Sequence, residues 1–130
     1  STISKNKLNE IVKFHGRKNH QELKKYIQNA IIGVCFIPQT PYYDVQPPTK
    51  IFEYALSGLI TIATNTAENR RFITATNGVI CEDNAESFCE ALEKVYANLD
   101  KYNDRKIRES LAVYNWKNIV KNILLPILEK

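Results

Sequence analysis

Residues 47–63 decide the fold, and they read Pro47-Pro48-Thr49-Lys50-Ile51-Phe52-Glu53-Tyr54-Ala55-Leu56-Ser57-Gly58-Leu59-Ile60-Thr61-Ile62-Ala63. The pattern predicts a helix that begins at a proline and ends at a glycine. Proline suits the first helical turn because its missing N–H would have no partner there. Gly58 stands where helices commonly end in a left-handed residue. The apolar, β-branched run Leu59–Ala63 then predicts a buried strand.

Two charged residues on this helix are candidates for a binding site. Lys50 and Glu53, together with Ser57, are spaced three and four apart and therefore share one helix face. A cation in the first turn opposes the helix dipole, but a phosphate bound at the helix N-terminus removes that conflict. A glutamate one turn further on can accept hydrogen bonds from vicinal hydroxyls, as acidic residues do for ribose. The alternative is an ordinary Lys50–Glu53 surface pair worth about 0.2–0.5 kcal/mol.

Length and composition indicate one globular domain spanning residues 1–130. The 130 residues are 44% hydrophobic and 25% charged, which is usual for a soluble protein. No apolar run approaches the roughly 18 residues that a membrane helix needs, and the polar start does not resemble a signal peptide. Because methionine is absent, even at position 1, we expect a fragment of a longer protein.

Charge and cysteine usage argue against several classes of function. The net charge of +4 is mild and the basic residues are scattered, so we predict no nucleic-acid partner. Cys35, Cys81 and Cys89 lack the spacing of metal ligands, as do the two histidines, and we predict no metal site. Free thiols are typical of a reducing compartment, so we expect a cytoplasmic protein.

Apolar runs and helix caps alternate along the chain. The expected strands are Ile11–Phe14, Ile31–Ile37, Leu59–Ala63 and Val79–Cys81. Three expected helices are capped by Asn19, by Asn65 or Thr66, and by Asn84. The others are Pro48–Ser57, a helix that begins at Asp104 and ends near Tyr114, and Trp116–Leu128. This alternation predicts an α/β fold with a doubly wound parallel sheet of about four strands and flanking helices. The long apolar run Ile31–Ile37 is typical of a central strand covered on both faces.

The predicted topology places a binding site near Lys50. Ligands of such sheets bind beyond the carboxyl ends of the strands. The proline-rich loop Pro38–Pro48 follows one of these ends and leads directly into the helix that carries Lys50 and Glu53.

The order of these features resembles a known family. The matching segments are Val12–Gly16, Ile32–Pro38, Pro48–Gly58, Asn77–Ile80 and Tyr114–Trp116. Together they resemble the carboxyl-terminal, Rossmann-like domain of a GT-B retaining glycosyltransferase of the group 1 or family 4 type. The Pro-x-Lys-x-x-Glu-Tyr core is the most specific part of the match.

The resemblance implies a site for a nucleotide-diphosphate sugar, which is a substrate, and it implies no cofactor. The glutamate that matches Glu53 holds the ribose hydroxyls of the donor in this family. The segment that matches Pro47–Lys50 lies near the diphosphate and the sugar. The residues expected to bind the nucleotide-sugar are Glu53, Lys50, Thr49, Pro48, Gly16 and Arg17.

The chain also departs from the family pattern. Many members carry a second glutamate where this chain has Val45, next to Asp44. The family's domain normally begins with two further strands, which bring a glycine-rich turn and a basic residue for the diphosphate. The amino-terminal acceptor domain is a missing partner. We therefore expect the donor-binding fragment of a transferase of surface polysaccharide or lipopolysaccharide biosynthesis, inactive alone, whose parent associates peripherally with the inner face of the membrane.

The two missing strands would lie between Ile11–Phe14 and Ile31–Ile37, and their loss predicts one of two repairs. In the first, Ile11–Phe14 pairs directly with Ile31–Ile37. We favour this outcome because the intervening helix is long enough for a parallel crossover. In the second, two chains join through their open sheet edges as a homodimer.

A different class of function is the alternative. A small flavodoxin-like or receiver-like α/β module would act by binding a partner. A receiver needs a phosphoacceptor Asp and an acidic pair at strand ends, whereas only Val79–Cys81 runs into acids, Glu82 and Asp83. Such a module should not bind UDP or GDP.

Overall fold

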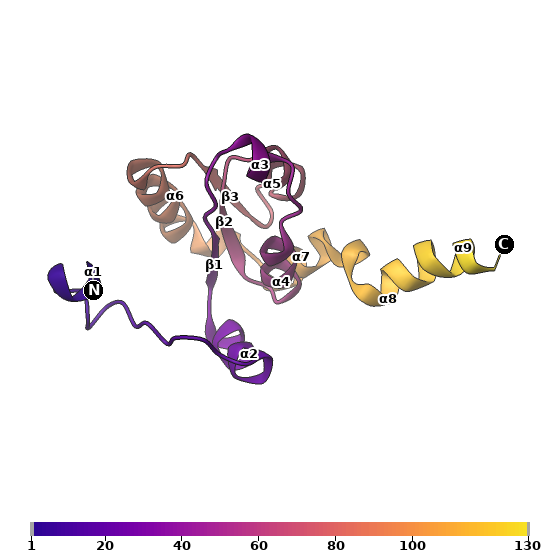
Figure 1. Cartoon of the computed structure of the whole chain (residues 1–130), viewed down its shortest axis with the longest axis horizontal. Helices are drawn as coiled ribbons and strands as arrows, with labels where there is room; N and C mark the ends of the chain where they lie inside the picture. Colours follow the sequence, from indigo (N-terminus) through magenta and orange to yellow (C-terminus); the bar gives the residue numbers. More distant parts are fainter. Residues whose placement is uncertain (1, 130) are drawn as a thin grey trace.

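A three-stranded parallel sheet organises the fold of this protein, whose computed structural model describes residues 2–129. The strands are β1 (Ile32–Cys35), β2 (Ile60–Thr64) and β3 (Gly78–Cys81), in the spatial order β1-β2-β3. Their register aligns Val34 with Ile62 and Ile62 with Val79. The α/β class and the parallel, Rossmann-like arrangement predicted from the sequence are confirmed (Figure 1).

Helices surround this sheet and extend beyond it. The α-helices are α1 (Thr2–Lys5), α2 (His20–Asn29), α3 (Pro41–Asp44), α4 (Thr49–Leu56), α5 (Ala67–Phe72), α6 (Ala85–Ala97), α7 (Asp104–Ser110), α8 (Trp116–Ile119) and α9 (Leu125–Leu128). Three short segments of other helical types are η1 (Leu99–Lys101), η2 (Ala112–Tyr114) and the π-helical η3 (Val120–Leu124). Of the helices in residues 2–129, none is long and apolar enough to cross a membrane.

The central strand β2 is the best buried element, and all five of its residues are enclosed. Helix α4 packs on one face through Ile51 and Ala55, and α6 packs through Ala91 and Val95. Successive strand residues point to opposite faces, so the two helices sandwich the sheet. The buried hydrophobic cluster contains Cys35, Ile51, Ala55, Ile60, Ile62, Ala63, Ile73, Cys81, Ala91, Val95, Ile107 and Leu111.

The helix caps follow the sequence closely. The side chain of Asn19 accepts a hydrogen bond from the backbone N–H of Glu22, whose carboxylate accepts from the Asn19 N–H, and this completes a capping box. Thr66 rather than Asn65 caps α5, and Asn84 caps α6. At the end of α4, Gly58 takes a left-handed φ of 85° before the chain enters β2, as predicted.

The prediction of a fourth strand is wrong. Residues Ile11–Phe14 are exposed and belong to no strand, so the sheet has three strands rather than four. A crossover helix positions the preceding strand in the sheet only if an apolar face of the helix packs on that sheet. None of the residues His20–Asn29 in α2 is buried, so nothing holds Ile11–Phe14 against β1. The favoured repair by direct pairing therefore does not occur.

The position of β1 also differs from the prediction. The Ile31–Ile37 run was expected to form a central strand covered on both faces, but β1 is an edge strand. Gly33 and Cys35 are buried on the side of α4, while Val34 is 40% exposed on the other side. The apolar sequence of this run is typical of a strand buried on both faces. In the described part of the chain, the face that carries Val34 is only partly covered.

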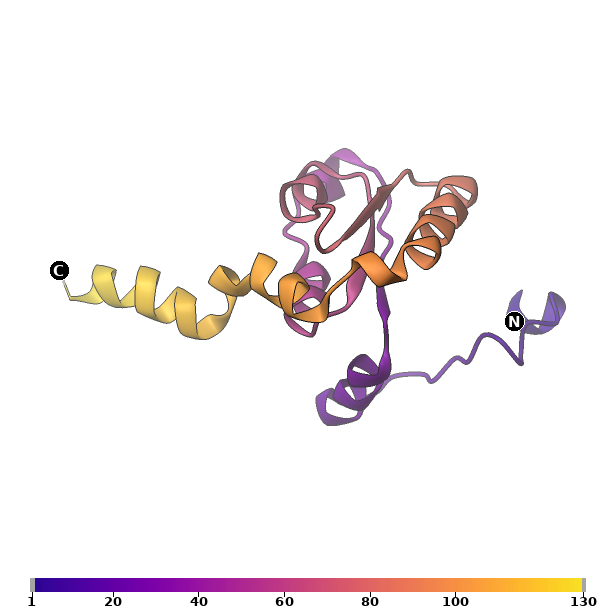
Figure 2. The same ribbon diagram turned by 180° about the vertical axis from the view of Figure 1, so that it is seen from behind.

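Both ends of the chain leave the body of the fold. Residues before α2 extend to one side, and α8 to α9 project to the other, in both views (Figures 1 and 2).

Candidate functional site

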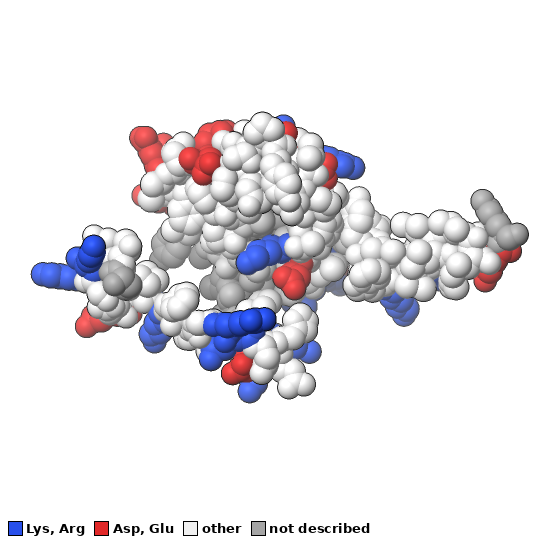
Figure 3. All heavy atoms as spheres, in the orientation of Figure 1, with Lys and Arg blue, Asp and Glu red and all other residues white. Residues whose placement is uncertain are grey.

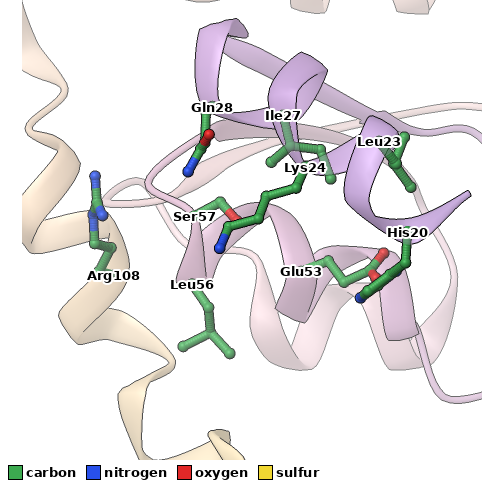
Figure 4. A pocket seen from close by; sticks show the side chains of 9 residues that line it. All are labelled: His20, Leu23, Lys24, Ile27, Gln28, Glu53, Leu56, Ser57 and Arg108. Atoms are coloured by element: carbon green, nitrogen blue, oxygen red, sulfur yellow. The ribbon is translucent and has the colours of Figure 1, made fainter.

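A hollow of about 700 Å³ lies between α2 and α4 and reaches α7 (Figure 4). Its lining residues are His20, Leu23, Lys24, Ile27, Gln28, Glu53, Leu56, Ser57 and Arg108. The two helices contribute both apolar and polar side chains to the lining, which is the usual composition of a small-molecule site.

The polar groups are spread along the hollow. Glu53 and His20 lie near each other at one end, and Lys24 extends from α2 toward Ser57 (Figure 4). Arg108 stands at the far end, where its guanidinium pairs with Asp104 at 3.0 Å. Lys and Arg side chains gather over α2, on the other wall of the hollow from Glu53 (Figure 3). The lining of the hollow therefore combines the Glu53 carboxylate with two cations, Lys24 and Arg108.

The packing of α4 directs Glu53 into the hollow. Ile51 and Ala55 are fully buried against the sheet, and the ring of Tyr54 covers Gly33 so closely that a Cβ there would collide with it. These contacts fix the rotation of the helix, so the exposed Glu53 side chain points away from the sheet. Among residues 2–129 the structure shows no ion pair or hydrogen bond of the Glu53 carboxylate, and the alternative Lys50–Glu53 surface pair does not form.

Lys50 does not share this hollow. It is exposed on α4 and is absent from the lining that contains Glu53. Its charge instead acts on the buried thiol of Cys35, whose pKa is raised by desolvation and lowered, to a lesser extent, by Lys50. Lys50 thus lies toward the carboxyl end of β1, as the topology predicted, while the hollow runs along α4 in the other direction.

The remaining predicted site residues fall into two places. Pro48 is buried and is the N-cap of α4. Thr49 lines a second, largely apolar groove of about 570 Å³, which Glu53 also lines together with Tyr114 and Trp116. Glu53 therefore stands on a ridge between two hollows.

Gly16 and Arg17 lie outside both hollows. They belong to the exposed segment that leads into α2, where Gly16 has a left-handed φ of 64°. The preceding His15 folds back on α2, and its ring lies 4.5 Å from that of Tyr26. The structure thus brings Gly16 and Arg17 to the start of α2 but not into contact with Glu53.

Sequence reasoning did not identify His20, Lys24 or Arg108. His20 and Lys24 are spaced four apart on α2, so a shared face could have been found from the sequence. Their position opposite Glu53 depends on the angle between two helices, and Arg108 comes from a distant helix, so no local pattern reveals either. Ser57 was correctly placed on the face of Glu53.

Hydrogen bonds close the carboxyl edge of the sheet. The Gln39 backbone N–H donates to Asp83 at 3.0 Å, and its side-chain amide donates to Glu82 at 3.1 Å and to the Asn65 carbonyl at 2.8 Å. The Asp44 carboxylate accepts from the N–H of Ala67 at 2.7 Å, at the start of α5. These bonds tie the Pro38–Pro48 loop across all three strand ends. Within the described part of the chain, no cluster of three or more His, Cys, Asp and Glu side chains could hold a metal ion.

Comparison with known proteins defines the class. The model of the family described as "Glycosyl transferases group 1" matches residues 2–98. The match covers most of the chain, and this chain belongs to the group 1 glycosyltransferases, which transfer sugars. No curated protein and no solved structure matches it.

Proposed function

We propose that this chain is the donor-binding portion of a glycosyltransferase that moves a sugar from a nucleotide-diphosphate sugar to a hydroxyl acceptor. The parent enzyme would be a hexosyltransferase of surface polysaccharide or lipopolysaccharide biosynthesis. The observation that carries the proposal is the free carboxylate of Glu53, held by a rigid helix at the rim of a hollow with cationic neighbours.

Each end of a nucleotide-sugar has a matching group on α4. A carboxylate accepts two hydrogen bonds from vicinal ribose hydroxyls, which suits Glu53. Lys50, in the first turn of α4, suits the diphosphate and would stabilise the charge that develops on it as the sugar leaves. The acceptor site and the catalytic groups belong to the amino-terminal domain, so this chain alone is expected to be inactive.

A nucleotide titration tests the proposal. UDP and GDP, each compared with its 2′-deoxy form, are added to ¹⁵N-labelled chain while amide shifts are followed. We expect one of the two bases to shift the amides around Glu53, with a Kd on the order of 1 mM because the phosphate site is incomplete. The 2′-deoxy nucleotide should bind several-fold more weakly, since it offers Glu53 one hydroxyl instead of two.

Matched variants locate the site. Glu53→Gln should weaken UDP or GDP binding and abolish the preference over the 2′-deoxy form, whereas Glu90→Gln, on the exposed face of α6, should change neither. Shifts near Glu53 that are absent for every nucleotide at 10 mM (roughly ten times the expected Kd) would contradict the proposal and favour the partner-binding module. Sugar transfer by the chain alone would contradict the expected inactivity.

A further inference from the structure

The hollow between α2 and α4 changes its chemistry along its length. Glu53 lines one end, whereas Lys24, Gln28 and Arg108 line the part that lies toward the end of α4 (Figure 4). A carboxylate accepts hydrogen bonds, while the lysine and arginine side chains only donate them. A ligand that fills the hollow therefore needs hydroxyl groups at one end and hydrogen-bond acceptors at the other.

The ammonium group of Lys24 is available to such a ligand. Its side chain extends from α2 across the hollow toward Ser57 (Figure 4). Among residues 2–129, Lys24 makes no ion pair or hydrogen bond through its side chain, whereas Lys18 at the start of the same helix pairs with Glu22 at 3.7 Å. Lys24 is therefore a free donor that faces the hollow.

Arg108 is held at the far end of the hollow by its neighbours. It lies against Gly58, where an added Cβ would be 2.9 Å from its Nε and Nη2 atoms. The Asp104 carboxylate accepts from Nη2 at 3.0 Å, and the described residues make no other hydrogen bond with the guanidinium. Because a guanidinium carries five N–H donors, most of those of Arg108 remain free for a ligand.

An apolar shelf, defined as Leu23, Ile27 and Leu56, lies between the two ends. Ser57 follows Glu53 by four residues, so it stands about 6 Å further along α4. A flat ring lying on the shelf would have the Glu53 carboxylate on one side and the free donors on the other. A nucleoside has this arrangement, because its ribose carries vicinal hydroxyls and its base is a flat ring with acceptors on its edge.

The charges around the hollow determine which way a nucleotide lies in it. Lys50, proposed above for the diphosphate, precedes Glu53 by one turn, on the side away from Arg108. Asp104 beside Arg108 adds a negative charge that repels a phosphate but not a neutral base. With its ribose at Glu53, the nucleotide therefore directs its base toward Lys24 and Arg108.

Two donors at that end favour one base. Guanine presents two acceptors, O6 and N7, on one edge, whereas adenine presents N7 beside an amino donor. Cytosine has an amino donor on the corresponding edge, and uracil, like thymine, has a single carbonyl acceptor there. We propose that Lys24 and Arg108 bind O6 and N7 of guanine, so that the hollow selects a guanine nucleotide-sugar. This inference rests on the proposed donor site and names the base that the site accepts.

Matched nucleotides test the choice of base. GDP, inosine diphosphate, 7-deaza-GDP, ADP and UDP are titrated into the ¹⁵N-labelled chain. Inosine diphosphate keeps O6 and N7 and should bind within about twofold of GDP. 7-Deaza-GDP lacks the N7 acceptor and should bind several-fold more weakly. ADP and UDP should bind about tenfold more weakly or less, from the usual discrimination of a donor pair between bases.

Matched variants test the two side chains. Arg108→Met and Lys24→Met remove the donors and should each weaken GDP binding about five- to tenfold while leaving ADP binding unchanged. Arg105→Met, on the same helix as Arg108, and Lys25→Met, next to Lys24, lie outside the hollow and should change neither. All four residues are exposed, so unchanged amide spectra away from the hollow confirm that the fold is intact.

The outcomes separate this inference from the proposed donor site. Equal affinity for GDP and ADP, or a preference for UDP, would overturn the guanine assignment even if the Glu53-dependent preference over 2′-deoxy nucleotides persists. Equal losses for every nucleotide in Arg108→Met and Lys24→Met would also overturn it, because the two cations would then bind the phosphates. Failure of all five nucleotides to bind would overturn both the guanine assignment and the donor site.

Discussion

At the scale of single residues, Gly58 controls the passage from α4 into β2. Its φ of 85° is one that side chains with a Cβ rarely adopt, and a Cβ there would lie 2.9 Å from the Arg108 guanidinium. The Arg108 side chain can move away, so the main cost is backbone strain. Gly58→Ala should lower the free energy of unfolding by about 1–2 kcal/mol, measured by urea denaturation.

Gly16 provides the control. Its φ of 64° is also left-handed, but nothing lies within 4 Å of the added Cβ, and the surrounding segment is exposed. Gly16→Ala should leave the urea midpoint unchanged, because the strained segment is not part of the cooperative core. A loss as large as that of Gly58→Ala would mean that residues before α2 are packed in solution.

The buried side-chain amide of Asn77, next to β3, allows a second test of a single residue's contribution to stability. The Asn77 side chain donates to the Phe72 carbonyl at 2.9 Å and to the Ser110 hydroxyl at 3.0 Å, and it accepts from the Thr74 N–H at 2.9 Å. Asn77→Ala leaves these partly buried partners unsatisfied, which should cost about 2–4 kcal/mol. Asn98→Ala, which removes one exposed bond to Lys94, should cost less than about 1 kcal/mol. Equal urea midpoints for the two variants would contradict this assignment.

At the scale of elements, α2 and α6 both have asparagine N-caps, but only α6 packs residues into the core. Asn19→Ala should destabilise α2 by about 1 kcal/mol, visible as roughly fivefold faster amide exchange in that helix. The free energy of global unfolding should not change, because His20–Asn29 buries no residue. Asn84→Ala should lower global stability by a similar amount, since α6 places Ala91 and Val95 in the core. Global loss from Asn19→Ala would show that α2 packs more tightly than its burial indicates.

Elements defined by local chemistry could be predicted from the sequence. The capping box of α2, the asparagine cap of α6, the glycine end of α4 and the apolar run of β2 each depend on a few neighbouring residues. The predicted strand Ile11–Phe14 is wrong because a strand forms only where a partner pairs with it. The resemblance indicates that two neighbouring strands are missing, but no local pattern shows that α2 fails to bring Ile11–Phe14 to β1 in their place. Without that pairing, β1 is an edge strand rather than a central one.

The candidate site was predicted to the extent that it lies on one helix. The shared face of Glu53 and Ser57 follows from helical spacing, and both residues line the hollow. Lys50 was assigned to the same cleft, yet the hollow runs away from it toward Arg108. Which end of a helix faces a cavity depends on how the neighbouring helices pack against it. A local sequence pattern does not show that packing.

At the scale of the whole molecule, buried thiols make stability depend on pH. Burial raises the pKa of Cys35 above its ordinary 9.0, and burial followed by the charges of Glu82 and Asp83 raises that of Cys81. The folded state thus holds these protons more tightly than the unfolded state does. The stabilisation that these two thiols contribute is complete below the pKa of a thiol in the unfolded chain. It is lost as the pH rises through the higher pKa values of the folded state.

Urea unfolding between about pH 7 and pH 10 measures this dependence. We expect the free energy of unfolding to be constant near neutrality and to fall on the alkaline side. Cys35→Ala/Cys81→Ala should flatten the fall, whereas Cys89→Ala, at an exposed thiol, should not. Stability that rises with pH would contradict the sign derived from the two raised pKa values.

The open edge of β1 predicts self-association of the whole chain. Direct pairing with Ile11–Phe14 does not occur, and β1 has no strand neighbour on its outer side within residues 2–129. An unpaired edge offers backbone donors and acceptors to any other edge. Val34 within β1, and Ile31 and Phe36 next to its two ends, are exposed apolar residues, so pairing of two edges would also bury apolar surface. Two identical edges join most simply about a twofold axis, which makes the new pair antiparallel.

Sedimentation velocity over a range of concentrations should therefore show a monomer–dimer equilibrium. Val34→Lys places a charge on the edge strand, the device by which natural edges avoid pairing, and should shift the equilibrium to monomer. Tyr96→Lys adds the same charge on α6 and should leave the dimer intact. A chain that stays monomeric at the highest concentration, with or without Val34→Lys, would mean that the β1 edge is satisfied by water alone. The sheet would then accept further strands only from the rest of the parent enzyme.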